Sequence, residues 1–142
     1  MATAAELIQT AGEAREAFKA AVATAADRWE TASEGEDAEW TPRHIAEHAI
    51  GAERRFAGMM AEGVGQSAPT PEELSLASAE EAAAAFDASS EAVGAVVQAV
   101  SEENIGAAAS MPEGAPFDKT VAGVLNLVTW HYQDHTGQIS KV

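Results

Sequence analysis

Apolar residues recur at every third or fourth position in four separate stretches of this chain, and this period constrains the fold more than any other feature. An α-helix has about 3.6 residues per turn, so the spacing places the apolar side chains along one face of each stretch. Much of the 46% apolar content is alanine, the best helix former, and only 6% of the residues are aromatic. The 142 residues are therefore predicted to form one all-α domain, a four-helix bundle.

The first two helices have recognisable limits. The first is predicted to run from about Ala4 to Thr31 and to be followed by an acidic loop at residues 33–39. The second is predicted to begin at Pro42, because proline suits the first helical position and Thr41 before it is a good N-cap. It should end near residues 60–62, where a stretch rich in glycine and proline begins.

The last two helices begin at further capping residues. Ser78 followed by Glu81 forms the pattern of a capping box and predicts the start of the third helix. The stretch 103–118 has the composition of a loop, which we expect to be mobile or to cover another part of the molecule. The fourth helix is predicted to begin near Asp118 or Thr120.

All four histidines of the chain fall into two pairs with a spacing of four residues, His44 with His48 and His131 with His135. Residues at this spacing lie on one face of a helix, with Cβ atoms about 5–6 Å apart. His131 and His135 continue the apolar stripe of the fourth helix, and His48 lies on that of the second. We therefore predict a metal site formed by His48, His131 and His135 with an open coordination position. Imidazole suits zinc, nickel, iron and copper, so the ligands alone do not select the metal.

Other interpretations of these residues stay open. A histidine on an apolar stripe is often a core residue without a metal, although three such imidazoles together would each need a hydrogen-bond partner. His44 is expected to be exposed at the end of the bundle. Alternatively, it could be a fourth metal ligand or could form a hydrogen bond to one of the ligands. Glu47, Asp134 and Gln138 are candidates to hold the second nitrogen of a ligand, or are solvent-facing helix residues.

Charge and composition exclude several classes of partner. The net charge is −15, with 23 acidic residues against 8 basic ones, which argues against nucleic acid and anionic lipid. There is no cysteine, so any thiol chemistry would need a thiol from a cosubstrate. No apolar run approaches the roughly 20 residues of a membrane helix. The N-terminus has neither the basic region nor the apolar core of a signal peptide, so a cytoplasmic location is expected.

Two motifs resemble the DinB-like (DinB/YfiT) superfamily. They are WTPRHIAEHAIGAERRF, from Trp40 to Phe56, and HYQDHTGQI, from His131 to Ile139, and the order and length of the segments match over nearly the whole chain. The resemblance implies an up-down-down-up bundle and a divalent metal, commonly nickel or zinc, bound by His48, His131 and His135. It also implies a possible homodimer. Characterised members of the family include thiol-dependent enzymes, such as mycothiol-dependent maleylpyruvate isomerase and bacillithiol transferases.

Three functional hypotheses follow. The first is a metal-dependent enzyme that acts on a small molecule, as a transferase or isomerase using a low-molecular-weight thiol or as a hydrolase; no catalytic side chain is assigned. A metal ion can activate a water or a thiol and polarise a substrate. The second is a non-catalytic stress protein that binds a metal or a ligand. The third is a structural bundle whose histidines are ordinary core residues.

Overall fold

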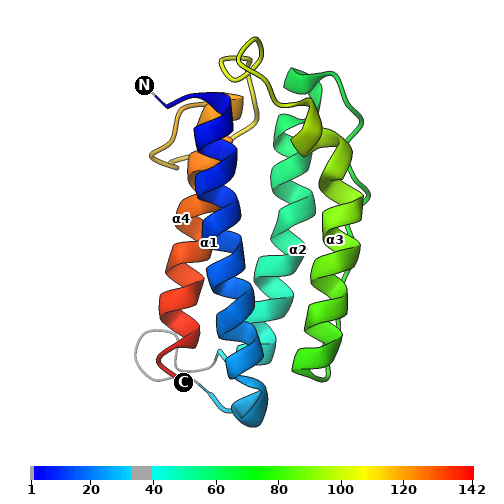
Figure 1. Ribbon diagram of the computed structural model, residues 1–142, viewed down its shortest axis with the longest axis vertical. Coiled ribbons are helices and arrows are strands. Elements are labelled where there is room, and N and C mark those ends of the chain that lie inside the picture. Colours follow the sequence, from blue (N-terminus) through cyan, green and yellow to red (C-terminus); the bar gives the residue numbers. More distant parts are fainter. Residues whose placement is uncertain (1, 33–39) are drawn as a thin grey trace.

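The computed structural model describes residues 2–32 and 40–142, and its helices form a four-helix bundle (Figure 1). The four α-helices are α1 (Ala4–Thr24), α2 (Pro42–Ala61), α3 (Ala79–Ala99) and α4 (Val121–Ile139). The described residues contain no β-strand, only one isolated bridge between Ala108 and Thr120. The all-α prediction is confirmed. The acidic loop predicted at residues 33–39 lies outside the described part of the chain.

The connections define an up-down-down-up arrangement. In Figure 1, α1 and α4 run from the top of the bundle to the bottom, whereas α2 and α3 run from the bottom to the top. Helix α1 packs chiefly on α4, and α2 packs on both α3 and α4. The topology implied by the family resemblance is therefore confirmed. No helix in the described ranges has the length and apolar character needed to cross a membrane.

The parallel orientation of α2 and α3 requires a connection that runs back along the bundle, and side chains of the bundle hold that connection in place. The Leu76 N–H donates to the Glu47 carboxylate at 2.8 Å, and the Leu76 carbonyl accepts from the Trp29 indole at 2.8 Å. Farther up, Arg54 on α2 lies 3.1 Å from Glu72. Leu76 itself is buried, so the connection contributes to the core.

The core has two hydrophobic clusters, one in each half of the bundle. One cluster surrounds Phe18, Phe86 and Tyr132, whose exposed fractions are 1% or less. The other cluster includes Phe56, Met60 and several valines of α3 and α4. Full burial of one such side chain contributes roughly 1.5–3 kcal/mol, so the two clusters hold the helices together.

The helix starts agree with the capping residues read from the sequence. Thr41, Ser78 and Thr120 each accept a hydrogen bond from the backbone N–H three residues later. At Ser78 this bond to the Glu81 N–H is one half of the predicted capping box. Helix α2 ends at Ala61, as predicted.

The first helix is shorter than predicted. Helix α1 ends at Thr24 and is followed by a 3₁₀ turn, Ala26–Arg28, rather than continuing to Thr31. The buried Trp29 explains the difference, because its indole N–H is bound to the connection before α3 and its carbonyl accepts from the Arg43 N–H at 3.0 Å. These tertiary hydrogen bonds direct the chain away from the axis of α1. The apolar spacing in the sequence continues to Trp29, so it places the end of the helix too late.

The stretch 103–118 covers the upper end of the bundle, one of the two roles expected of it. Its Ser110 N–H donates to the Met59 carbonyl at 3.3 Å, and the Val121 N–H donates back to the Ala107 carbonyl at 3.0 Å. Gly63 on the facing 3₁₀ turn (Glu62–Val64) allows this approach, because a Cβ there would lie 3.0 Å from a backbone oxygen of the loop.

Candidate metal centre

Three imidazoles meet at the interface of α2 and α4. His48 comes from α2, and His131 and His135 come from α4. Each offers a ring nitrogen, and the three nitrogens lie within 4.8 Å of one another. The His131 Nε2 is 3.2 Å from the His48 Nε2 and 3.1 Å from the His135 Nε2. The spacing of four residues on α4 and the packing of α2 on α4 thus bring together the three histidines singled out in the sequence.

The nitrogen separations match a shared metal ion. Nitrogens about 2.0–2.1 Å from one tetrahedral ion are about 3.3 Å apart, close to the two separations measured from the His131 Nε2. A hydrogen-bonded explanation fits less well, because one Nε2 atom of a neutral ring carries a single proton and cannot donate to two neighbours. The donor set therefore fits a divalent ion such as zinc or nickel.

The electrostatic surroundings keep two of the rings neutral. Burial, and then the proximity of His135 and Arg55, lower the pKa of His48 to about 4. Burial, and then the neighbouring His135 and His48 rings, lower the pKa of His131 to about 3. A metal ligand must be an unprotonated imidazole, so these two side chains are ready to coordinate at neutral pH.

The orientation of His135 is fixed by Gln138, one helical turn later. The Gln138 Oε1 lies 2.6 Å from the His135 Nδ1, and both side chains are buried. An amide oxygen accepts a hydrogen bond, so this contact places the proton on Nδ1 and leaves the Nε2 lone pair free for a metal. Gln138 was one of three candidates for this position, and the structure supports it.

The other two candidates lie elsewhere. The Glu47 carboxylate accepts from the Leu76 N–H and lies 3.2 Å from the Arg43 Nε, so it holds the connection between α2 and α3. Asp134 is exposed. The His131 Nδ1 is buried and has no hydrogen-bond partner among the described residues; its ring is held by packing, edge-on to Phe56 with ring centroids 5.1 Å apart.

The fourth histidine stands apart from the three. His44 is exposed, as expected, and its ring stacks on Trp40 with centroids 4.1 Å apart and planes 8° from parallel. Trp40 in turn lies edge-on to His48, with centroids 5.3 Å apart, and its plane is nearly parallel to that of His135 at 6.1 Å. Trp40 therefore covers one side of the three-histidine group, and His44 packs behind it.

A buried polar cluster next to the site was missed in the sequence. Glu53 on α2 accepts from the Arg15 Nε at 2.6 Å and from the Tyr132 hydroxyl. Burial and the carboxylate of Glu53 raise the pKa of Tyr132 well above its ordinary value. For Arg15, burial acts to lower the pKa, but the carboxylate outweighs it and the pKa is raised. The spacing in the sequence could have indicated that these residues are buried. Glu53 follows Ala49 by four residues and Tyr132 follows Val128 by four, so each lies next to the predicted apolar stripe of its helix, and the buried face includes both.

The fold and the three-histidine group together define a helical-bundle protein whose imidazoles could hold a metal ion. The sequence model of the DinB superfamily matches residues 13–139, and the chain belongs to this superfamily. Searches of curated proteins and of solved structures give no match to this chain.

Proposed function

We propose that His48, His131 and His135 bind one divalent metal ion, nickel or zinc, and that the protein is a metal-dependent enzyme acting on a small molecule. The convergence of the three Nε2 atoms, with separations of 3.1 and 3.2 Å, carries the proposal. The reaction is a transfer or isomerisation that uses a low-molecular-weight thiol, or a hydrolysis. The chain has no cysteine, so the thiol would come from a cosubstrate.

Three neutral imidazoles add no charge of their own, so a bound divalent ion keeps its full charge and supplies Lewis acidity at an open coordination position. Residues of the chain orient the three imidazoles toward the metal and shield them from water. Gln138 holds the Nε2 of His135 toward the centre, and burial keeps His48 and His131 unprotonated. Trp40 covers one side of the group and reduces its contact with water.

A second function is favoured by the contacts of the three rings. The rings contact the aromatic side chains of Trp40, Phe56 and Tyr132 and the amide of Gln138, and the exposed Arg55 lies near enough to lower the pKa of His48 and His131. The Tyr132 hydroxyl already donates to Glu53, so these groups position the imidazoles rather than transfer protons. The alternative function is therefore a protein that binds a metal or a small ligand without catalysing a reaction.

Metal analysis of protein purified without a histidine tag tests the site. We expect about one nickel or zinc per chain, lost on chelation and absent from His48→Ala and His131→Ala. His44→Ala is the matched control, because His44 lies on the same helix one turn earlier but is exposed and outside the group. Failure of the wild type to take up nickel or zinc would refute the site, as would equal loss of metal in the control.

Turnover separates the two functions. The metal-loaded protein is assayed with glutathione, mycothiol and bacillithiol against a panel of small electrophiles, and with esters and amides without thiol. The enzyme proposal predicts activity that His131→Ala abolishes and His44→Ala retains. Tight binding of metal without turnover would favour the second function, and activity unchanged in His131→Ala would contradict the role of the centre.

A further inference from the structure

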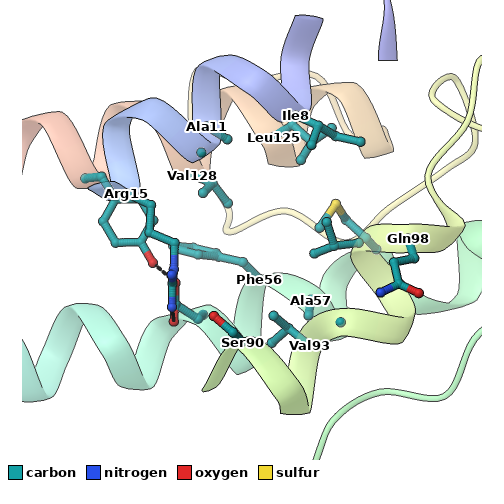
Figure 2. Close-up of a pocket in the computed structure, with 16 residues that line it drawn as sticks. Ile8, Ala11, Arg15, Phe56, Ala57, Ser90, Val93, Gln98, Leu125 and Val128 are labelled. Atoms are coloured by element: carbon teal, nitrogen blue, oxygen red, sulfur yellow. Dashed lines mark hydrogen bonds and ion pairs between the residues drawn. The ribbon is translucent and has the colours of Figure 1, made fainter. Parts of the chain in front are cut away.

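A cavity of about 300 Å³ lies between the helices of the bundle, and one of its lining residues, Phe56, also packs edge-on against His131. All four α-helices line it, with apolar side chains that include Ile8, Phe56, Val93 and Leu125. In Figure 2, Arg15 lies at one end of this cavity and Gln98 at the other. The cavity is open to solvent on one side, so its apolar lining is only partly removed from water. A ligand that covered this lining would bury apolar surface, which favours binding.

Small residues on facing helices create the space. Ala11 and Gly12 on α1, Ala57 on α2 and Gly94 on α3 line it. At Gly12 and Gly94 an added Cβ would meet no atom within 4 Å. Glycine inside a helix lowers helix stability by about 1 kcal/mol relative to alanine, and at both positions a larger side chain would have open space to occupy.

The opening lies between α1 and α3, which pack less closely on each other than α1 does on α4. The exposed residues of the lining are Gly12 on α1 and Ser90 and Gln98 on α3. A molecule would therefore enter between these helices and meet polar groups only at the rim and at the Arg15 end (Figure 2).

The Arg15 end of the cavity is polar but carries no net charge. Arg15 and Glu53 form an ion pair at 2.6 Å, and the Tyr132 hydroxyl donates a hydrogen bond to the same carboxylate. The Arg15 Nη2 also donates to the Phe86 carbonyl at 2.9 Å. Arg15 is thus engaged by the protein, and the chain as a whole carries a charge of −15. Both facts disfavour an anionic ligand.

We infer that this cavity is a binding site for a neutral, largely apolar small molecule. Its size sets the scale, since an engineered apolar cavity of about 150 Å³ holds a benzene molecule. The space here suits an aromatic compound of two or three rings or an aliphatic chain of similar volume, with at most one neutral polar group at the Arg15 end. The site is distinct from the three-histidine group, whose imidazoles do not line it.

Fluorescence titration of the full chain with N-phenyl-1-naphthylamine, a neutral probe of three aromatic rings that becomes emissive in apolar surroundings, tests the inference. We expect saturable binding of one probe per chain, and at least tenfold weaker binding of its sulfonated analogue 8-anilinonaphthalene-1-sulfonate. Absence of saturable binding by the neutral probe, or a preference for the sulfonate, would overturn the inference.

Variants locate the probe. Gly94→Leu places a side chain in the cavity and should weaken binding at least tenfold, whereas Gly94→Ala changes helix preference with little volume and should stay within twofold of the wild type. Gly12→Leu tests the same space from α1, and circular dichroism verifies that each variant is folded. His44→Ala, which is exposed and outside both the cavity and the three-histidine group, should retain binding. Wild-type affinity in both leucine variants would exclude this cavity as the site.

Discussion

Replacement of Glu53 by methionine is predicted to be the most damaging single change in the centre of the bundle. The Glu53 side chain is 8% exposed and accepts from the Arg15 Nε at 2.6 Å, from the Arg15 Nη2 at 3.3 Å and from the Tyr132 hydroxyl. Methionine has a similar length and no charge, so Glu53→Met removes the acceptors while leaving little empty volume. The variant leaves a guanidinium and a hydroxyl without their partner inside the protein.

The expected loss follows from these contacts. Removal of one partner of a buried ion pair destabilises a protein by about 3–5 kcal/mol. Arg15 is 20% exposed and can recover some hydration, which favours the lower end of that range. The Tyr132 hydroxyl, left without its acceptor, adds about 1 kcal/mol. We therefore expect the free energy of unfolding to fall by about 4 kcal/mol in total. For a domain of this size that corresponds to a fall in Tm of roughly 10 °C.

A double variant separates the ion pair from simple packing. Arg15→Met alone should also be strongly destabilising, because it leaves the Glu53 carboxylate buried without its cation. In Arg15→Met/Glu53→Met both charges of the pair are removed together, so the double variant should be more stable than Glu53→Met. It should not regain full stability, because Arg15 also donates to the Phe86 carbonyl and lies over the Phe86 ring at 5.1 Å.

Urea denaturation followed by circular dichroism measures all four proteins, with Tm as a second readout. If the two residues stabilise each other, the double variant should lose less free energy of unfolding than the two single variants lose together. If Glu53→Met were within about 1 kcal/mol of the wild type, or if the two losses simply added, the ion pair would not be the interaction that holds these helices.

Three further predictions concern the centre and α4. Gln138→Ala should weaken nickel or zinc binding by about 10–100-fold, measured by competition with a chelator, because its partner imidazole loses its fixed orientation; unchanged affinity would contradict this role. In the metal-free protein the pKa values of His48 and His131 are lowered from 6.5 to about 4 and about 3, so the unfolded chain binds more protons than the folded one in this range. The free energy of unfolding should therefore fall as the pH drops below about 6.5, and urea midpoints at several pH values should show a steeper fall than in a variant with glutamine at both positions. Gly123→Ala should destabilise the protein by about 1–3 kcal/mol, because its Cβ would lie 1.8 Å from a backbone carbonyl oxygen, whereas Gly137→Ala, which meets nothing within 4 Å, should be neutral or stabilising in thermal denaturation.

The helices and their starts were predictable because the signals are local. Thr41, Ser78 and Thr120 act on backbone N–H groups three residues away, and the apolar period depends only on the geometry of one helix. The end of the first helix was not predictable in the same way. It depends on Trp29 binding a carbonyl that lies 47 residues later in the chain, and no local pattern contains that contact.

The sequence by itself determined which histidines share a helix face, since the spacing of four between His131 and His135 places both rings on one side of α4. The apolar stripe of the second helix also separated His48 from His44, but only the tertiary structure decided that the His48 ring lies within reach of the other two, because that distance depends on how α2 packs on α4. The same holds for the pairing of Arg15 with Glu53, whose charges are 38 residues apart in the chain. Periodicity fixes the direction of a side chain relative to its own helix, whereas the distance between helices depends on how all four faces pack at once.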